Sequence, residues 1–120
     1  MCCMSWVVED TDQFEEWYFA LVPSDQNAVD AHVEILKLRG PGLGRPYVDH
    51  VKRSRHQNMK ELRVQSGGKP IRIFFAFDPR RTGMLLIGGD KTGDERFYER
   101  MIRLADDLYA EHLREIGETQ

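Results

Sequence analysis

The segment spanning residues 59–91 constrains the fold of this chain most strongly, because it predicts two consecutive β-hairpins. Three runs with strand character are separated by two compact turn sequences, Ser-Gly-Gly-Lys at 66–69 and Asp-Pro-Arg-Arg at 78–81. Glycine, proline and aspartate between apolar runs are the usual signal of a tight turn. We therefore predict three antiparallel strands at the centre of the fold, with helices packed around them.

The register of the first hairpin follows from its turn. With Gly67 and Gly68 at the turn centre, residues at equal distances on the two strands face each other. The predicted pairs are Val64 with Ile71, Arg63 with Arg72, and Leu62 with Ile73. Two guanidinium groups directly opposite each other cost stability in an isolated sheet. We therefore expect something outside the hairpin to bind this positive charge.

Side chains alternate between the two faces of a strand, so the members of each hairpin face can be predicted. The apolar face is expected to meet the core and carries Leu62, Val64, Ile71, Ile73, Phe75 and Phe77. The opposite face, called the arginine face below, carries Glu61, Arg63, Arg72, Phe74 and Ala76. If residues 80–81 centre the second turn, Leu85, Ile87 and Lys91 join the arginine face. A slip of one residue would move all three to the other side.

The composition indicates one soluble domain covering residues 1–120, with 41% hydrophobic and 31% charged residues. The two cysteines, Cys2 and Cys3, are adjacent near the N-terminus and offer neither a disulfide framework nor a metal-site spacing. This fits a reducing cytoplasm. No apolar run approaches the roughly 18 residues of a membrane span, and no secretion leader is evident.

A net charge of −3 conceals a strong partition along the chain. Residues 1–51 contain nine acidic and three basic residues, residues 52–81 two acidic and nine basic, and residues 82–120 nine acidic and five basic. A basic middle between acidic flanks is a candidate anion-binding surface of the kind that attracts phosphate backbones. The alternative is a solvated loop whose charges pair with the acidic helices.

Helices are predicted on both sides of the hairpins. After a short strand candidate at 6–9, Asp12 and Glu15 have the spacing of a capping box, and aromatic residues follow at helical spacing. We interpret these aromatics as core residues rather than a base-stacking platform. A Pro-Ser pair at 23–24 starts a second helix, which runs to about Arg39.

A final helix follows the sequence Thr-Gly-Asp at 92–94. Its predicted buried stripe consists of Phe97, Met101, Leu104 and Leu108.

Residues 40–58 form the longest segment without a helix or strand pattern. It ends with four basic or titratable residues, Lys52, Arg53, Arg55 and His56. Long loops in compact domains are usually functional or mobile. Because this segment leads directly into Lys60 and the first hairpin, we expect it to add positive charge to the arginine face. A flexible solvated loop is the alternative.

Several common catalytic motifs are absent. The sequence Gly-Gly-Asp-Lys-Thr-Gly at 88–93 lacks the order of a phosphate-binding loop, because Asp90 stands before Lys91. The histidines have no ligand spacing, so no metal site is predicted; they are His32, His50, His56 and His112. The chain has no Gly-x-Ser-x-Gly motif, which argues against a serine nucleophile.

The element order and several sequence blocks resemble one known family. A strand, a helical hairpin, three antiparallel strands and a closing helix are the order of the RelE-like α+β fold, in which the N-terminal strand and helical hairpin pack on a small antiparallel sheet. The blocks GPGLGRPYVDHVKRSRHQNMKELRVQ, IRIFFAFDPRR, and LLIGGDKTG followed by FYERMIRLADDLY resemble the phage Gp49-like, HigB-type branch of the RelE/ParE toxin superfamily. The resemblance extends from about Trp6 to Leu113.

This resemblance implies a toxin of a type II toxin–antitoxin pair that cleaves mRNA on the translating ribosome and thereby inhibits translation. The implied partner is an antitoxin, in this branch usually a helix-turn-helix, HigA-like protein that also represses the shared operon. No cofactor is implied. RNA can be cleaved by attack of its own 2′-OH on the adjacent phosphate, provided that the enzyme orients the strand and stabilises the developing charge.

The resemblance also implies roles for individual residues. Arg63 and Arg72 would stabilise transition-state charge, because guanidinium groups suit phosphate oxygens. Lys60 is the candidate general base, since a lysine among other cations can have a lowered pKa. Lys91 would contact phosphate or act as an acid. Five further cations are expected to bind the RNA backbone: Lys52, Arg53, Arg55, Arg80 and Arg81.

Two features differ from the family pattern. The chain is mildly acidic, whereas members of the superfamily are often strongly basic. Tyr98 and Tyr109 both fit helical packing, so neither is an assured counterpart of the catalytic tyrosine of some members. Two other functions therefore stay open: a ParE-like protein shares the fold but inhibits DNA gyrase without cleaving RNA, and a regulatory binding module would have lost toxicity.

Overall fold

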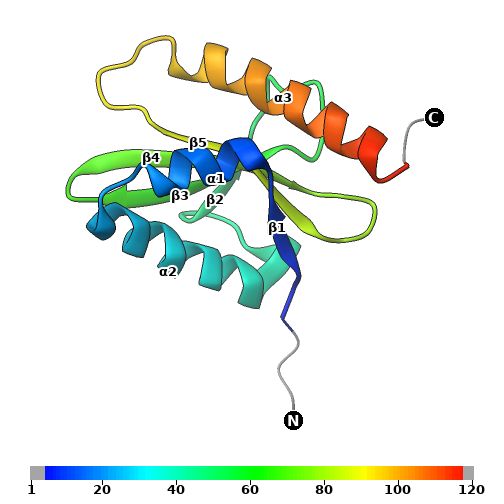
Figure 1. The fold of residues 1–120 in the computed structure, drawn as a ribbon, viewed down its shortest axis with the longest axis horizontal. Helices are drawn as coiled ribbons and strands as arrows, with labels where there is room; N and C mark the ends of the chain where they lie inside the picture. Colours follow the sequence, from blue (N-terminus) through cyan, green and yellow to red (C-terminus); the bar gives the residue numbers. More distant parts are fainter. Residues whose placement is uncertain (1–4, 118–120) are drawn as a thin grey trace.

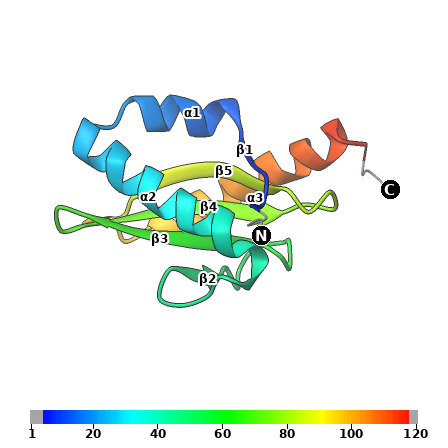
Figure 2. The same ribbon diagram turned by 90° about the horizontal axis from the view of Figure 1, so that it is seen from below.

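The computed structural model describes residues 5–117 as a five-stranded sheet with three α-helices (Figure 1). The strands are β1 (Val8–Asp10), β2 (Val48–His50), β3 (Lys60–Ser66), β4 (Lys69–Phe77) and β5 (Gly83–Asp90). The helices are α1 (Asp12–Phe19), α2 (Pro23–Arg39) and α3 (Phe97–Glu115), with a short 3-10 helix, η1 (Gly40–Gly42). The strand order is β1-β5-β4-β3-β2, in which only β1 and β5 are parallel neighbours (Figure 2). The predicted α+β fold is confirmed.

Helices cover both faces of the sheet. On one face α1 and α2 pack against the apolar side of the hairpins, where Phe14 and Val29 meet Leu62. On the other face α3 packs over the arginine face, where Phe97 contacts the core around Phe74. The charged groups of the arginine face therefore lie at the margin of an apolar core rather than on a bare sheet.

The predicted register of the first hairpin is confirmed, including all three cross-strand pairs. The second hairpin contains a register shift, because Phe74 pairs with Ile87 whereas Phe75 pairs with Leu85. Ile87 consequently belongs to the core on the α3 side, as predicted, but Leu85 belongs to the opposite core. A bulge of one residue reverses the side to which the following side chains point, which explains why the prediction for Leu85 was wrong.

Two details of the predicted helices are corrected. The N-cap of α1 is Thr11, whose Oγ1 accepts a hydrogen bond from Phe14 N at 2.9 Å and donates one to Leu86 O at 2.7 Å. In α3, Leu104 is 39% exposed and Ile102 is buried in its place. Both residues fit a helical repeat, and the position of the helix on the sheet decides between them.

Residues 40–58 are not a continuous irregular loop, since they contain η1 and the edge strand β2. This strand pairs antiparallel with β3 and places Asp49 directly opposite Glu61. A three-residue strand with aspartate at its centre carries little sequence signal. Its importance is positional, because it brings an additional carboxylate to the arginine face.

The remaining predictions concern membrane spans, metal sites and the two cysteines. Within residues 5–117, no helix combines the length and apolarity needed to cross a membrane, and no cluster of three metal-ligating side chains occurs. Cys2 and Cys3 lie outside this range.

Candidate nucleic-acid interface

Glu61 lies at the centre of the arginine face and contacts both arginines. Arg63 Nε donates to the carboxylate at 3.2 Å, and Arg72 Nε lies 3.9 Å from it. Only 4% of the surface of Glu61 is exposed. The carboxylate therefore offsets the repulsion between the paired guanidinium groups, and it does so from within the hairpin itself.

The two arginines differ in accessibility. Arg72 is 9% exposed, its Nη1 donates to Ile71 O at 3.1 Å, and its buried Nε has no hydrogen-bond partner among the described residues. The side chain of Arg63 is 36% exposed. Arg63 is therefore placed to contact a ligand directly, whereas Arg72 contributes positive charge from beneath the surface.

Tyr98, in the first turn of α3, completes the cluster. Its hydroxyl donates to Glu61 Oε1 at 2.8 Å, and Lys91 Nζ lies 5.2 Å from the centre of its ring, within cation–π range. Burial and the hydrogen bond to Glu61 raise the pKa of Tyr98. The hydroxyl thus stays protonated at neutral pH. The conditional placement of Lys91 on the arginine face agrees with this contact.

The edge strand β2 restrains Arg63 from the other side. Arg63 Nη2 lies 3.3 Å from Asp49 Oδ2, and Arg45 Nη2 lies 3.2 Å from the same oxygen. A hydrogen bond from the backbone N–H of His50, together with the two arginines, lowers the pKa of Asp49. Asp49 is therefore ionised at neutral pH, and Arg63 is shared between two carboxylates.

Asp106 of α3 fixes residues 52–56, called the basic loop below, against the helix. Its carboxylate, in a residue only 2% exposed, accepts hydrogen bonds from Ser54 Oγ at 2.5 Å and from Arg55 N at 2.9 Å. The guanidinium of Arg55 also forms an exposed ion pair with Asp107 at 3.1 Å. The segment 40–58 is therefore anchored to α3 near its C-terminal end, at residues 54 and 55.

Two shallow cavities follow the line between this loop and α3. The first, of about 120 Å³, is lined by Lys52 and Arg53 together with Glu61 and Tyr98. The second, of about 270 Å³, shares Arg53 and Tyr98 with the first and adds two cations and two carboxylates: Arg55, Arg103, Glu99 and Asp106. Cations of the loop thus border the same hollow as the carboxylate that holds Arg63 and Arg72.

Lys60 is not brought to this surface. Strand alternation directs its side chain to the α2 side of the sheet, where Nζ donates to Pro41 O at 3.1 Å. Burial lowers the pKa of Lys60, as a general base would require, but the sheet separates it from Arg63. The general-base role predicted for Lys60 stays a prediction, and the structure places this lysine on the face of the sheet opposite to Arg63.

Arg80 and Arg81 lie in the β4–β5 turn, which follows the C-terminal end of β4. Arg80 Nη2 is bonded to Asp78 at 2.8 Å and to Glu9 at 3.0 Å. The guanidinium of Arg81 lies 5.4 Å from the ring centre of Trp6. Arg80 is thus paired with carboxylates, and the turn itself lies beside residues 55–58, where Asn58 Nδ2 donates to Phe77 O at 2.9 Å.

Comparison with known proteins identifies the family. The model described as "Phage derived protein Gp49-like (DUF891)" matches residues 16–110. This chain belongs to the Gp49-like family. The resemblance inferred from the sequence blocks is confirmed.

Two similar proteins from Mycobacterium tuberculosis place the chain in the HigB-type branch. The protein named "Putative toxin HigB2" is 42% identical over 113 residues, which cover 92% of this chain and 56% of that protein. The protein named "Putative toxin HigB3" is 48% identical over 95 residues, which cover 78% of this chain and 82% of that protein. The chain thus spans little more than half the length of the first relative.

A solved structure supports the fold independently. The crystal structure of the archaeal RelE–RelB complex from Pyrococcus horikoshii superposes with a TM-score of 0.56, covering 75% of this chain and 99% of the matched chain at 13% sequence identity. At this identity the likeness shows a shared RelE-like fold.

Three residues of this candidate site could not be assigned from the sequence. Glu61 was placed on the correct face by strand alternation but was given no role, although it lies between two cations. Asp49 required knowledge of β2, and Asp106 required the docking of α3 on the basic loop. Only the first of these had a local signal in the sequence.

Proposed function

We propose that this Gp49-like chain is the toxin of a type II toxin–antitoxin pair, and that it cleaves mRNA on the ribosome. The observation that carries the proposal is the arrangement of Arg63, Arg72 and Glu61 beside a hollow bordered by Lys52 and Arg53. Positive charge near the hollow attracts a phosphate backbone, and the buried groups beneath it offer fixed electrostatics for chemistry on that phosphate. The HigB-type relatives support the same assignment.

In this proposal Arg63 binds the scissile phosphate. Its side chain is accessible, and a guanidinium matches two phosphate oxygens. Arg63 must give up part of its pairing with Glu61 and Asp49 to do so, which the greater negative charge of a pentacoordinate phosphate favours. Arg72 remains in place and stabilises the same charge over a longer distance.

Glu61 and Tyr98 take the place of Lys60 as candidates for proton transfer. The carboxylate and the phenol are already joined by a hydrogen bond of 2.8 Å, and both border the smaller cavity. Glu61 accepts the proton of the attacking 2′-OH. The leaving 5′-oxygen takes a proton from Tyr98 or Lys91. The products are a 2′,3′-cyclic phosphate and a 5′-hydroxyl, and the proton held by Glu61 returns to the group that protonated the 5′-oxygen, which regenerates the site.

The proposal includes a protein partner and a compartment. A toxin that acts on translation needs an inhibitor in the same cell, and we expect a helix-turn-helix antitoxin encoded next to this chain. Activity on ribosomes places the protein in the cytoplasm.

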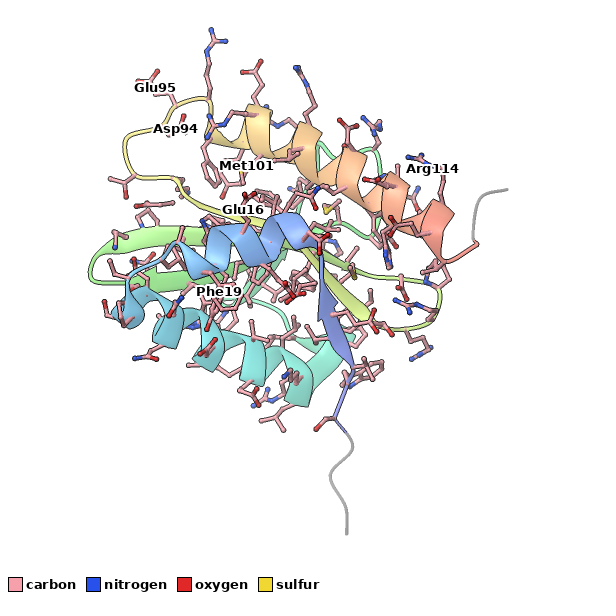
Figure 3. All side chains as sticks on the ribbon, viewed as in Figure 1. Glu16, Phe19, Asp94, Glu95, Met101 and Arg114 are labelled. Carbon is pink, nitrogen blue, oxygen red and sulfur yellow. The ribbon has the colours of Figure 1, made fainter. Side chains whose placement is uncertain are left out.

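Mapping of RNA 5′ ends after induced expression in a bacterial host tests the nuclease. We expect new cuts inside translated frames with the wild type and their loss with Arg63→Ala. Arg114→Ala is the matched control, because this exposed arginine lies near the C-terminal end of α3, away from the hollow (Figure 3). It should cut as the wild type does.

Arg72 needs a different substitution because it is buried. Arg72→Lys keeps the charge and most of the volume, so a loss of cutting with an unchanged unfolding temperature would report on chemistry rather than on folding. Growth arrest without new 5′ ends would contradict the nuclease and favour the gyrase alternative. Cutting that persists in Arg63→Ala would reject the proposed site.

A further inference from the structure

A groove runs between α1 and α2 on the face of the sheet opposite to the arginine face. It has a volume of about 410 Å³ and is bordered by β1 at one end. Its floor is apolar, with contributions from Phe14, Val29 and Leu85, all of which are largely buried. Phe19, 72% exposed, stands at its lip on the side of α1 that faces α2 (Figure 3). The groove therefore offers apolar contacts that no described segment of the chain covers.

The walls of the groove are acidic. Four carboxylates line it: Asp10, Glu15, Asp30 and Glu34. The lining contains one cation, Lys37, and its Nζ is already paired with Glu34 at 3.3 Å. The local field therefore favours positively charged groups and repels phosphate.

The groove is held in its present shape. Tyr18 of α1 donates a hydrogen bond to Asp30 of α2 at 2.6 Å, which joins the two helices across the opening. A site whose walls are already positioned loses less entropy when a ligand binds.

The end of the groove near β1 concentrates negative charge. Burial, followed by the hydrogen bond and charge of Glu15 and the charges of Asp12 and Glu9, raises the pKa of Asp10 to about 6. These carboxylates repel one another, and a cationic side chain between Asp10 and Glu15 would relieve the repulsion.

We propose that this groove docks a segment of the antitoxin in which apolar side chains are flanked by Lys or Arg. The choice of the antitoxin rests on the proposed function, whereas the chemistry of the segment follows from the apolar floor and the acidic walls. Nucleic acid does not fit the acidic groove, and the cation-lined hollow lies on the other face of the sheet. The antitoxin segment and the RNA thus occupy opposite faces.

The test is a titration of the purified chain with the helix-turn-helix protein encoded beside it. Glu34→Lys reverses one wall charge, and Phe19→Ser removes the apolar lip; both residues are exposed, so their substitution leaves the fold intact. We expect each to raise the dissociation constant roughly tenfold or more. Two matched controls should stay within roughly twofold of the wild type. Glu16→Lys makes the same charge change on the other side of α1 (Figure 3). Leu38→Ser makes the same kind of apolar-to-serine change at an exposed residue of α2 that does not line the groove.

The outcomes separate this inference from the proposed function. Equal dissociation constants for the groove variants and the wild type would overturn the docking site while leaving the toxin–antitoxin pair intact. Failure of the wild type to bind would reject both the partner and the groove assignment. Without antitoxin, all four variants should cleave RNA as the wild type does, which shows that any weakened binding arises at the groove rather than from misfolding.

Discussion

Glu61 determines how the two opposed arginines of the hairpin can act. With one carboxylate between two guanidinium groups, the cluster keeps a net positive charge but is stable without a ligand. Asp49 adds a second carboxylate to Arg63. A phosphate that approaches Arg63 therefore competes with carboxylates that are already bound, so only a ligand with concentrated negative charge gains much from the exchange.

The hydrogen bond between Tyr98 and Glu61 predicts a specific effect of Tyr98→Phe. The ring contacts with Phe74 and Lys91 are retained, but Glu61 Oε1 loses its shortest hydrogen bond. We expect the free energy of unfolding, measured by urea denaturation, to fall by about 1 kcal/mol. The rate of RNA cleavage should fall by a larger factor than this loss of stability explains. Because the pKa of Tyr98 is raised, its absorbance should titrate above that of an ordinary tyrosine. A wild-type titration identical to that of Tyr98→Phe, apart from amplitude, would contradict this assignment.

At the scale of residues, the sequence predicted what depended on the first hairpin alone. The pairing of Arg63 with Arg72 followed from one turn, and the position of Glu61 followed from strand alternation. The same alternation places Lys60 on the opposite side from Arg63, so this position could be predicted from the sequence. The contact of Tyr98 with Glu61 was not, because it joins residues 37 positions apart through the docking of α3.

At the scale of elements, Gly88 and Gly89 in β5 bring the helices close to the sheet from both sides. A Cβ on Gly88 would overlap the ring of Trp17 from α1, and one on Gly89 would lie 2.9 Å from Phe97 Cε1 of α3. The glycine-rich sequence that superficially suggested a phosphate loop thus has a packing role. Because Gly88 and Gly89 have no side chains, Trp17 and Phe97 can pack directly against the backbone of β5.

Gly88→Ala should consequently loosen the packing of α1 on β5. We expect destabilisation of about 1–3 kcal/mol, measured by chemical denaturation, because Trp17 must leave its position. Gly44→Ala is the matched control, since a Cβ at Gly44 meets no atom within 4 Å. If both variants were equally stable, the close approach of Trp17 would not be maintained in solution.

The C-terminal part of α3 is attached to the β4–β5 turn through Asp78. His112 Nε2 lies 2.8 Å from its carboxylate, which also accepts hydrogen bonds from Arg80 and from Thr82 N. Burial alone would raise the pKa of Asp78, but these partners outweigh burial and lower it. A folded-state pKa below the unfolded value means that the stabilisation is present above about pH 4 and is lost as the pH falls through the folded value.

Asp78→Asn tests this attachment. At pH 7 the variant should be less stable than the wild type by about 2–3 kcal/mol, since a buried charged partner is lost. The difference should narrow as the pH is lowered toward 3, because the wild type then loses the same interaction. Asp107→Asn, on the exposed side of α3, provides the control and should change stability little. A difference that is constant with pH would show that Asp78 is not ionised in the folded protein.

The elements themselves were predicted where periodicity was strong and missed where tertiary pairing creates them. The long apolar repeat of α3 and the turns of both hairpins identified those elements, although the bulge beside Phe75 was invisible because only pairing reveals it. The strand β2 exists because β3 offers an unpaired edge. Neither feature has a local pattern from which it could be derived.

At the scale of the whole molecule, the acidic N-terminal part of the chain and the basic middle part lie on opposite faces, and the acidic α3 lies on the same face as the basic middle part. The basic residues that follow β2 gather beside α3, where Asp106 anchors their loop, whereas the acidic residues of β1, α1 and α2 surround the groove on the other face. A mildly acidic total is thus compatible with a local surface that binds RNA, because a salt-screened field acts over about 10 Å, less than the extent of the molecule.

This local surface predicts the salt dependence of RNA binding. The probe is a single-stranded oligonucleotide with 2′-O-methyl groups, which cannot be cleaved. Each lost phosphate contact reduces the slope of log affinity against log salt concentration by about 0.7. The double variant Lys52→Ala/Arg53→Ala should therefore reduce the magnitude of this slope by about 1.4. Arg81→Ala should leave the slope unchanged, because Arg81 stacks on Trp6 and lines neither of the two cavities beside α3. Binding measured by fluorescence anisotropy at salt concentrations from roughly 50 to 300 mM gives the slope for each variant. An equal decrease in both variants would mean that RNA extends over the β4–β5 turn and that the interface is larger than the hollow beside α3.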